Sequence, residues 1–393
     1  MGAGGERAPG SGLQGRRGRG RRRLLRSSEV PASITESFIL SGYRCPGYTF
    51  AQCLASAFRA TNETGNFWTH FLAVFIFAFH CLQPFWAEGA PPMPGPAGPG
   101  DPFFYPLWSY CLGVGSLLVA SSMAHLFNSM SLVIREICFY IDYGTISAYT
   151  VGSSLAYFYY IYPWEGSPAL APAGRGPVGS RGNHSTGPWA AAQEGPGGWL
   201  CTLAGPLGAW FEVLYVPSAC LIALFCTLAC CITRHQWPRY RYLIRTLVFL
   251  LPFLVVSIPV FHKLWWAGEG GQGLGHFFLR HCFWLLASGI FNVSKIPERF
   301  SPGTFDIWGH SHQWFHCCSF MSILDELHMI HGEMQEVAAV VAGMPRLPRL
   351  PTFLSTFGVM LLLFVLLASI VGWFGIKAYH ASLWWRVTAG KGD

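Results

Sequence analysis

Long apolar stretches, each close to the length of a membrane-spanning helix, most restrict the fold of this 393-residue chain. Hydrophobic residues make up 52% of it and charged residues only 11%, whereas a soluble domain typically carries about 25% charged residues. A helix needs about 20 mostly apolar residues to cross the hydrocarbon core of a bilayer. The sequence therefore predicts an all-α, polytopic transmembrane helix bundle.

Eight segments have the length and composition of membrane spans. They are residues 67–85, 104–127, 137–162, 209–232, 243–262, 276–293, 308–330 and 353–376. Pro252 and Pro259 predict a kink in the fifth, because proline removes a helical hydrogen bond and clashes with the preceding turn. We expect the first seven spans to form a core within residues 34–330. Residues 345–376 would then be a linker followed by an eighth, C-terminal span.

Three segments outside the spans are rich in glycine, proline or basic residues. Residues 1–33 are rich in arginine and glycine and predict a disordered cytoplasmic tail. No folded basic surface accompanies this tail, so nucleic-acid binding is not expected. Residues 163–208 predict a long extracellular loop rich in glycine and proline, and residues 377–393 a second cytoplasmic tail.

Basic residues predict the orientation, because cytoplasmic loops of membrane proteins carry an excess of Lys and Arg. With the N-terminus in the cytoplasm, 20 of the 26 Lys and Arg residues fall on the inner side. The glycosylation sequon at Asn183 then lies outside the cell and can be modified. Those at Asn62 and Asn292 fall at cytoplasmic span ends, where we expect no glycan.

Two histidines four residues apart, His312 and His316, open the seventh span and would share one helix face. The predicted orientation puts His125, near the end of the second span, at the same cytoplasmic depth. Ionisable side chains at membrane depth are costly and usually functional. Three histidine nitrogens and a water make a tetrahedral zinc site with an open position. We therefore predict Zn²⁺ bound by His125, His312 and His316.

The sequence is compatible with either a catalytic or a structural role for such an ion. Asp142, at the same depth, could act as a general base, and Ser121, one turn before His125, could donate to a substrate oxygen. Zinc would then polarise a carbonyl and activate water. The ion could equally be structural, and the same polar side chains could only hydrogen-bond helices together.

Other polar residues of these spans are expected to have structural roles. They are His70 (a capping or packing residue as readily as a ligand), His310 (on a different helix face from His312), His328 and His331 (interfacial), and Glu298 and Asp306 (ion partners at the cytoplasmic surface). Asp306 could alternatively hydrogen-bond a metal ligand from behind. The cysteines inside the spans are expected to be small packing residues.

Short motifs, in order along the chain, resemble the progestin and adipoQ receptor family. They are Ser41–Arg44, Asn62–Thr64 with Trp68–His70, Ser121 to His125, Asp142–Tyr143, and Pro297–Arg299 with Gly309–His316. The stretches Asn292–Arg299 and Gly309–His312 are most similar to the membrane progestin receptor branch, and within it to the epsilon subtype.

The resemblance implies a seven-helix fold with a cytoplasmic N-terminus. It maps the zinc ligands of the family onto His125, His312 and His316, and its motif serine and aspartate onto Ser121 and Asp142. The progestin branch is associated with steroid binding at the plasma membrane and rapid G-protein-linked signalling. The adiponectin-receptor branch is associated with zinc-dependent ceramide hydrolysis.

Two functions follow as expectations. The first is a multi-pass receptor of the cell membrane for a progestin-like steroid or another lipid, signalling rapidly through G proteins. The alternative is an enzyme, a zinc-dependent intramembrane lipid amide hydrolase similar to a ceramidase. The enlarged third loop and the arginine-rich tail depart from the family pattern, which leaves partners and regulation open.

Overall fold

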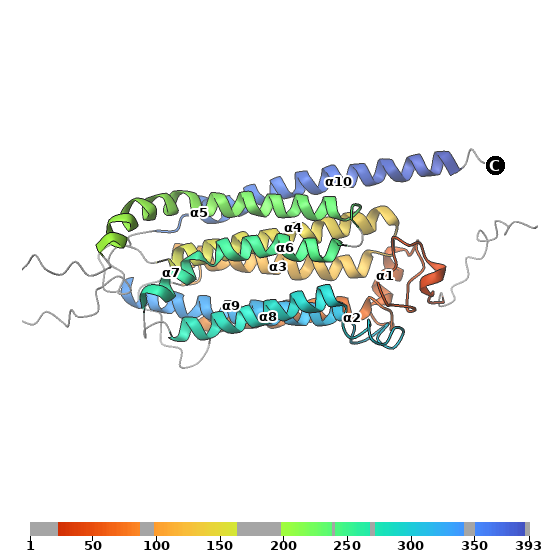
Figure 1. The fold of residues 1–393 in the computed structure, drawn as a ribbon, viewed down its shortest axis with the longest axis horizontal. Helices are drawn as coiled ribbons and strands as arrows, with labels where there is room; N and C mark the ends of the chain where they lie inside the picture. The colour runs from red at the N-terminus through yellow and green to blue at the C-terminus, as the bar shows by residue number, and fades with distance from the viewer. Residues whose placement is uncertain are drawn as a thin grey trace, which may run out of the picture.

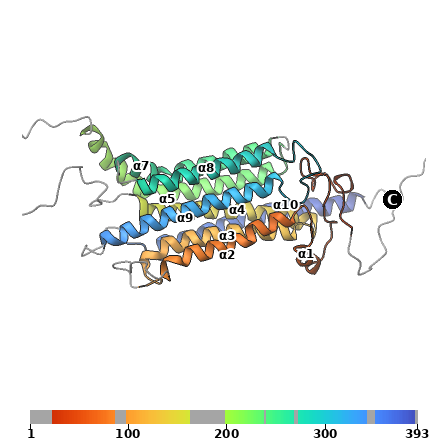
Figure 2. The same ribbon diagram turned by 90° about the horizontal axis from the view of Figure 1, so that it is seen from below.

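A computed structural model of the chain describes residues 23–86, 98–162, 198–237, 240–267, 272–341 and 350–389. Over these residues the protein is built from α-helices that run side by side along one long axis (Figures 1 and 2). The described residues contain no strand longer than one isolated bridge, between Leu25 and Tyr43. The all-α prediction is confirmed.

Ten α-helices occur among the described residues. In chain order they are α1 (Phe50–Ser56), α2 (Thr64–Leu82), α3 (Tyr105–Phe127), α4 (Leu132–Ala156), α5 (Gly198–Thr233), α6 (Arg241–Val256), α7 (Ile258–Ala267), α8 (Gln272–Ser294), α9 (Ser311–Val341) and α10 (Val359–Ala389). A π-helical turn, Tyr157–Ile161, continues α4, and another, Leu354–Gly358, precedes α10.

Five of the described helices are long and apolar enough to cross a membrane. They are Thr64–Phe85, Pro102–Phe127, Phe211–Thr233, Gln272–Ser294 and Leu354–Leu383. Helices α6 and α7 make a sixth if they count as one broken span. Helices α4 and α9 fall short because polar residues lower their mean hydropathy. Eight spans therefore remain a prediction.

The predicted kink in the fifth span is confirmed. Helices α6 and α7 meet at an angle of 46°, with Ser257 between them. Pro259 has no N–H to donate to the carbonyl of Val255, so the helical ladder breaks at this point. Pro252, by contrast, lies inside α6 without ending it.

Several boundaries differ from the prediction. Helix α5 begins at Gly198, so the last residues of the predicted loop 163–208 are helical, while residues 163–197 lie outside the described part. Gly205 and Pro206 argued for a loop, but membrane helices tolerate both residue types. Helix α9 begins at Ser311 rather than at residue 308 and ends at Val341 rather than at residue 330. Helix α10 continues to Ala389, so residues 377–389, predicted to belong to a tail, are helical. Residues 23–33, assigned to the tail, pair through Leu25 with Tyr43.

Among the described helices, α3 and α4 make the most extensive contact, and two glycines permit a close approach. A Cβ at Gly113 would lie 2.9 Å from the carbonyl oxygen of Ala148, and one at Gly152 would lie 2.9 Å from that of Ser109. Small residues let membrane helices approach in this way. Figure 1 shows α10 lying on the outer side of the bundle, where it contacts α4 and α5.

The two ends of the bundle are built differently. At one end, residues 23–62 pack beside the segment that joins α8 to α9, where Asp306 accepts hydrogen bonds from the Leu40 N–H (2.9 Å) and the Ser41 hydroxyl (2.6 Å). Asp306 is buried and is not the surface residue that the sequence suggested. Toward the other end a disulfide joins Cys81 of α2 to Cys111 of α3. These two cysteines are therefore not merely packing residues.

Candidate metal centre

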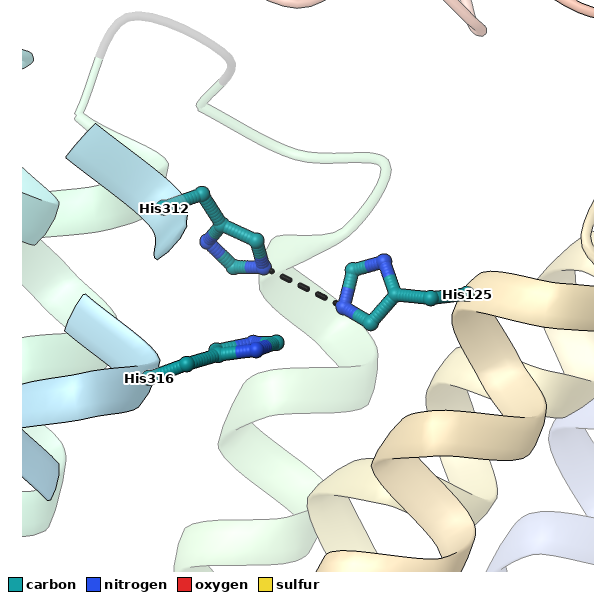
Figure 3. A group of neighbouring side chains, drawn as sticks. All are labelled: His125, His312 and His316. Carbon is teal, nitrogen blue, oxygen red and sulfur yellow. Dashed lines mark hydrogen bonds between the residues drawn. The ribbon is translucent and has the colours of Figure 1, made fainter. Parts of the chain in front are cut away.

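Three histidine side chains converge inside the bundle. Figure 3 shows His125 extending from α3 toward His312 and His316 of α9. One nitrogen of each can be chosen so that all three lie within 4.8 Å of one another, and the Nε2 atoms of His125 and His312 are 3.3 Å apart. The structure thus brings together the three residues that the sequence singled out.

The start of α9 sets the position of two of these histidines. The Glu298 carboxylate accepts a hydrogen bond from the Ser311 main-chain N–H (2.7 Å) and another from the Ser311 hydroxyl. A carboxylate at this place satisfies an N–H that has no partner within the helix and also favours the positive end of the helix dipole. Glu298 is buried, not a surface residue, and it fixes where the face bearing His312 and His316 begins.

His125 is oriented by a carboxylate that the sequence reasoning missed. Its Nδ1 atom lies 2.7 Å from Glu63, directly before α2, so its Nε2 atom faces the other histidines. Burial alone would raise the pKa of Glu63, but the hydrogen bond from His125 and the charges of Arg135 and Arg44 hold it well below the usual value. Glu63 therefore stays ionised and keeps the Nδ1 proton on His125.

His316 is held from behind by α2. Its Nδ1 atom lies 3.2 Å from the carbonyl oxygen of Asn66 and 2.9 Å from the hydroxyl of Thr69. A carbonyl only accepts hydrogen bonds, so Nδ1 carries the proton and the Nε2 lone pair is free. The His70 ring stacks on the His316 ring, with centroids 3.8 Å apart, so His70 is a packing residue here.

This arrangement fits a divalent transition-metal ion. Two ligands 2.0–2.1 Å from a tetrahedral ion lie about 3.3–3.4 Å apart, which matches the separation of the Nε2 atoms of His125 and His312. When both Nε2 atoms are unprotonated, a cation between them offsets the repulsion of their lone pairs. Partners of the outer nitrogens, like Glu63 and Asn66 here, are typical of histidine metal sites. His310 is excluded, because it hydrogen-bonds the Asn62 carbonyl instead.

Comparison with known proteins identifies the family. The haemolysin-III related family profile matches residues 58–324. The chain belongs to the haemolysin-III related family.

Named relatives place this family member in the membrane progestin receptor branch. It is 32% identical to membrane progestin receptor delta of Mus musculus over 319 residues, an alignment that covers 79% of each chain. It is 30% identical over 305 residues to membrane progestin receptor gamma of Homo sapiens, covering 76% of this chain and 78% of that protein. Membrane progestin receptor beta of Mus musculus is 26% identical over 313 residues, covering 77% and 74%.

In this haemolysin-III family protein the three histidines open onto a large cavity. Its volume is about 740 Å³, within the range of about 300–1,000 Å³ that is typical of small-molecule sites. It extends from the N-terminal segment at Ser33, past the histidines, to Tyr149 and Ser322 deep in the bundle. Helices α3, α4, α6, α8 and α9 supply most of the lining.

Asp142 and Ser121 line the same cavity as the histidines. Their side chains interact with each other, and Asp142 also lies within electrostatic range of His125. Among the described residues, the group able to hold a metal contains His125, His312 and His316 and does not include Asp142. Asp142 is therefore placed beside the candidate metal centre, where it can contact a ligand in the cavity.

Three residues that support the histidines were not predicted from the sequence. Glu63 contacts His125, and the main-chain carbonyl of Asn66 contacts His316. The side-chain amides of Asn128 and Asn66 both donate hydrogen bonds to Glu63, at 2.8 Å and 2.9 Å. A glutamate directly before an apolar span was the available signal, because an unpaired carboxylate there would be costly to bury.

Proposed function

We propose that this protein is a plasma-membrane receptor for a progestin-like steroid, with a zinc ion bound by His125, His312 and His316. The observation that carries the proposal is the cavity of about 740 Å³ beside the three histidines. It occurs in a chain about 30% identical to proteins named membrane progestin receptors. The lining includes Leu247 of α6 and Leu286 of α8, which are exposed on the outside of the bundle, so an apolar ligand can reach the cavity from the lipid phase.

The walls of the cavity suit an apolar, rigid molecule. Aromatic and aliphatic side chains from four helices face it, among them Leu117, Phe139, Phe253 and Leu285. Removal of apolar surface from water supplies about 25 cal/mol per Å², which is the main source of affinity for a steroid. The polar groups at the histidine end and at Tyr149 are spaced to orient it.

Eight spans with a cytoplasmic N-terminus accompany this proposal, seven of them in the core and α10 as the eighth. The peripheral position of α10 supports this division. The disulfide toward the end remote from the histidines supports the orientation, since disulfides persist in oxidising compartments. The epsilon subtype is our assignment within the branch, and it rests on the motifs at residues 292–299 and 309–312.

Ligand binding can be relayed to the cytoplasmic end through the N-terminal segment. The Tyr242 hydroxyl of α6 donates to Glu36 at 2.6 Å, and Ser41 donates to Asp306 before α9. A ligand that prefers one arrangement of α6 and α9 would shift the population of both contacts. We propose that G proteins read this change.

A second candidate function is a lipid amide hydrolase, and the position of Asp142 and Ser121 in the cavity favours it. Zinc would supply Lewis acidity toward the amide carbonyl. Asp142 would accept a proton from the attacking water, and Ser121 would donate to the substrate oxygen. The two functions are compatible in one protein.

One set of measurements tests both functions. Zinc content, progesterone binding and fatty-acid release from ceramide would be compared in purified wild type, His312→Ala and Asp142→Asn, with His310→Ala as the matched histidine control. We expect zinc loss only in His312→Ala, and steroid binding in wild type. Absence of metal from wild type contradicts the zinc centre, and absence of steroid binding contradicts the receptor. If Asp142→Asn releases fatty acid as fast as wild type, its catalytic role is wrong.

A further inference from the structure

One face of α4 lines the cavity along most of the helix. Its members are Arg135, Phe139, Asp142, Ile146 and Tyr149, and intervals of three and four residues place them on the same side of the helix. Arg135 lies near the start of α4, seven residues before Asp142, which corresponds to about 10 Å along the helix axis. The cavity-facing side of α4 therefore begins with a cation.

The Arg135 side chain is only 5% exposed, and its guanidinium lies among other residues of the cavity wall. It is 3.8 Å from the carboxylate of Glu36 and 3.9 Å from that of Glu63. Its central carbon is 5.1 Å from the centre of the Phe139 ring. Because all three neighbours line the cavity, the charged group of Arg135 is at the wall, and not only its aliphatic stem.

Most of the donors of this guanidinium have no close acceptor in the part of the chain that the structure describes. An arginine has five N–H donors in a planar fork. The Ile34 carbonyl accepts from it at 3.5 Å, longer than the usual range of about 2.7–3.2 Å. Both carboxylates lie beyond hydrogen-bond distance, and Nε is buried without a partner. Since an unpaired buried donor costs free energy, the group suits an acceptor that a ligand supplies.

Arg44, also buried at this end of the bundle, shows the contrast. It donates to the main-chain carbonyls of His125 and Leu126 and to the side chain of Asn128. It does not line the cavity. Arg44 thus joins segments of the protein, whereas Arg135 borders the space that a ligand would occupy.

The two carboxylates beside Arg135 decide what kind of acceptor fits. Glu63 is hydrogen-bonded to His125, and Glu36 accepts from the Tyr242 hydroxyl at 2.6 Å, so both are fixed near the guanidinium. A ligand anion placed there would be repelled by both carboxylates. A carbonyl oxygen accepts hydrogen bonds and carries no net charge. The site therefore favours a ketone over a carboxylate, phosphate or sulfate group.

We propose that the guanidinium of Arg135 donates to a ketone oxygen of the ligand and holds that end of the molecule at the histidine end of the cavity. The inference rests on the proposed function for the class of ligand, a progestin-like steroid, and names the residue that recognises its carbonyl group. The apolar body of the steroid then lies along α4, against Phe139 and Ile146 and opposite Phe253 of α6.

The test uses the full chain, purified in lipid nanodiscs with zinc. Dissociation constants would be measured for progesterone and for two analogues, in which hydrogens replace either the 3-keto or the 20-keto oxygen. One analogue should bind wild type about 10- to 100-fold more weakly than progesterone, the effect of one hydrogen bond to a charged group. The analogue that loses this affinity identifies the ketone that contacts Arg135.

A double variant removes the donors without changing the net charge of the group. Arg135→Met keeps most of the apolar stem, and Glu36→Gln removes one of the two carboxylates beside it. In this variant progesterone and the weaker analogue should bind about equally, because only the ketone compound loses a contact. The matched control is Arg280→Met, since Arg280 of α8 pairs with Asp325 at 3.0 Å and does not line the cavity. It should keep the wild-type ratio of the two constants.

A second variant keeps the test decisive if the double variant does not fold. Arg135→Lys retains the charge beside Glu36 and Glu63 but replaces the planar fork by a compact ammonium group. It should lower the ratio severalfold while binding of the weaker analogue stays the same. Zinc content and the midpoint of thermal unfolding show which variants are folded.

The outcomes distinguish the two proposals. Progesterone binding with no loss for either analogue refutes the subsite alone. An undiminished ratio in a folded Arg135 variant also refutes it, as does an equal loss of the ratio in Arg280→Met. If progesterone does not bind to wild type, the receptor function is refuted and the subsite with it.

Discussion

Replacing Glu63 with glutamine tests how the candidate metal centre is built, because this change alters no residue that would bind the metal. The Glu63 carboxylate accepts a hydrogen bond from the Nδ1–H of His125 at 2.7 Å and thereby orients Nε2 toward the other two histidines. A hydrogen bond to a charged group contributes about 1.5–3 kcal/mol, and one between neutral groups about 0.5–1.5 kcal/mol. The substitution therefore removes about 1–2 kcal/mol from the orientation of His125.

This energy corresponds to a fall in zinc affinity of about 5- to 30-fold, which overlaps the range typical of lost partners to metal-binding histidines. The affinity would be measured by competition with a chromophoric zinc chelator in nanodiscs. The matched control is Asp306→Asn, which makes the same carboxylate-to-amide change at a buried residue whose hydrogen bonds go to Leu40 and Ser41 and not to the three histidines. We expect the control to lower thermal stability but to change zinc affinity much less.

Two results would refute this reasoning. Wild-type zinc affinity in Glu63→Gln would mean that the carboxylate does not orient His125. An equal loss of affinity in Asp306→Asn would mean that any damage near this end of the bundle weakens the site, so that the contact between Glu63 and His125 has no special role.

Three further predictions concern stability, packing and topology. Removal of zinc by a chelator should lower the midpoint of thermal unfolding and added zinc should restore it, whereas His312→Ala should respond to neither treatment. Gly113→Ala should destabilise the protein by about 1–3 kcal/mol in thermal unfolding, because its Cβ would meet the backbone of α4; Gly115→Ala, where nothing lies within 4 Å, should have little effect. Asn183→Gln should remove a glycan seen as a gel shift, while a glycan at Asn292 would contradict the predicted orientation.

The helices and their order were largely readable from the sequence. Apolar runs with few charges predict membrane helices directly, since a bilayer does not tolerate unpaired backbone groups. The limits of this method appear at α4 and α9, whose polar residues keep them below the hydropathy of a span. These are the helices that carry Asp142 and the histidine pair. Polar residues at the candidate site therefore lower the hydropathy by which a membrane helix is identified.

Boundaries were less predictable than the helices themselves. Helix α9 begins at Ser311 because Glu298, thirteen residues earlier, folds back to cap it. Gly309, with φ +80, adopts a backbone conformation that glycine favours and that reverses the chain just before this cap. Neither the capping pair nor the turn follows from hydrophobic periodicity, which reports only the helical interior.

The sequence by itself determined the class of fold, and it narrowed the candidate metal ligands to His125, His312 and His316. The four-residue spacing put His312 and His316 on one helix face. The distribution of basic residues predicted the orientation, which placed His125 at the same depth. Only the tertiary structure decided which groups stand behind these histidines and what lies beyond them. The contacts of Glu63 with His125, of Asn66 with His316 and of Glu326 with Tyr149 join segments far apart in the chain. Such contacts depend on how helices rotate and pack, which no local pattern in a single sequence records.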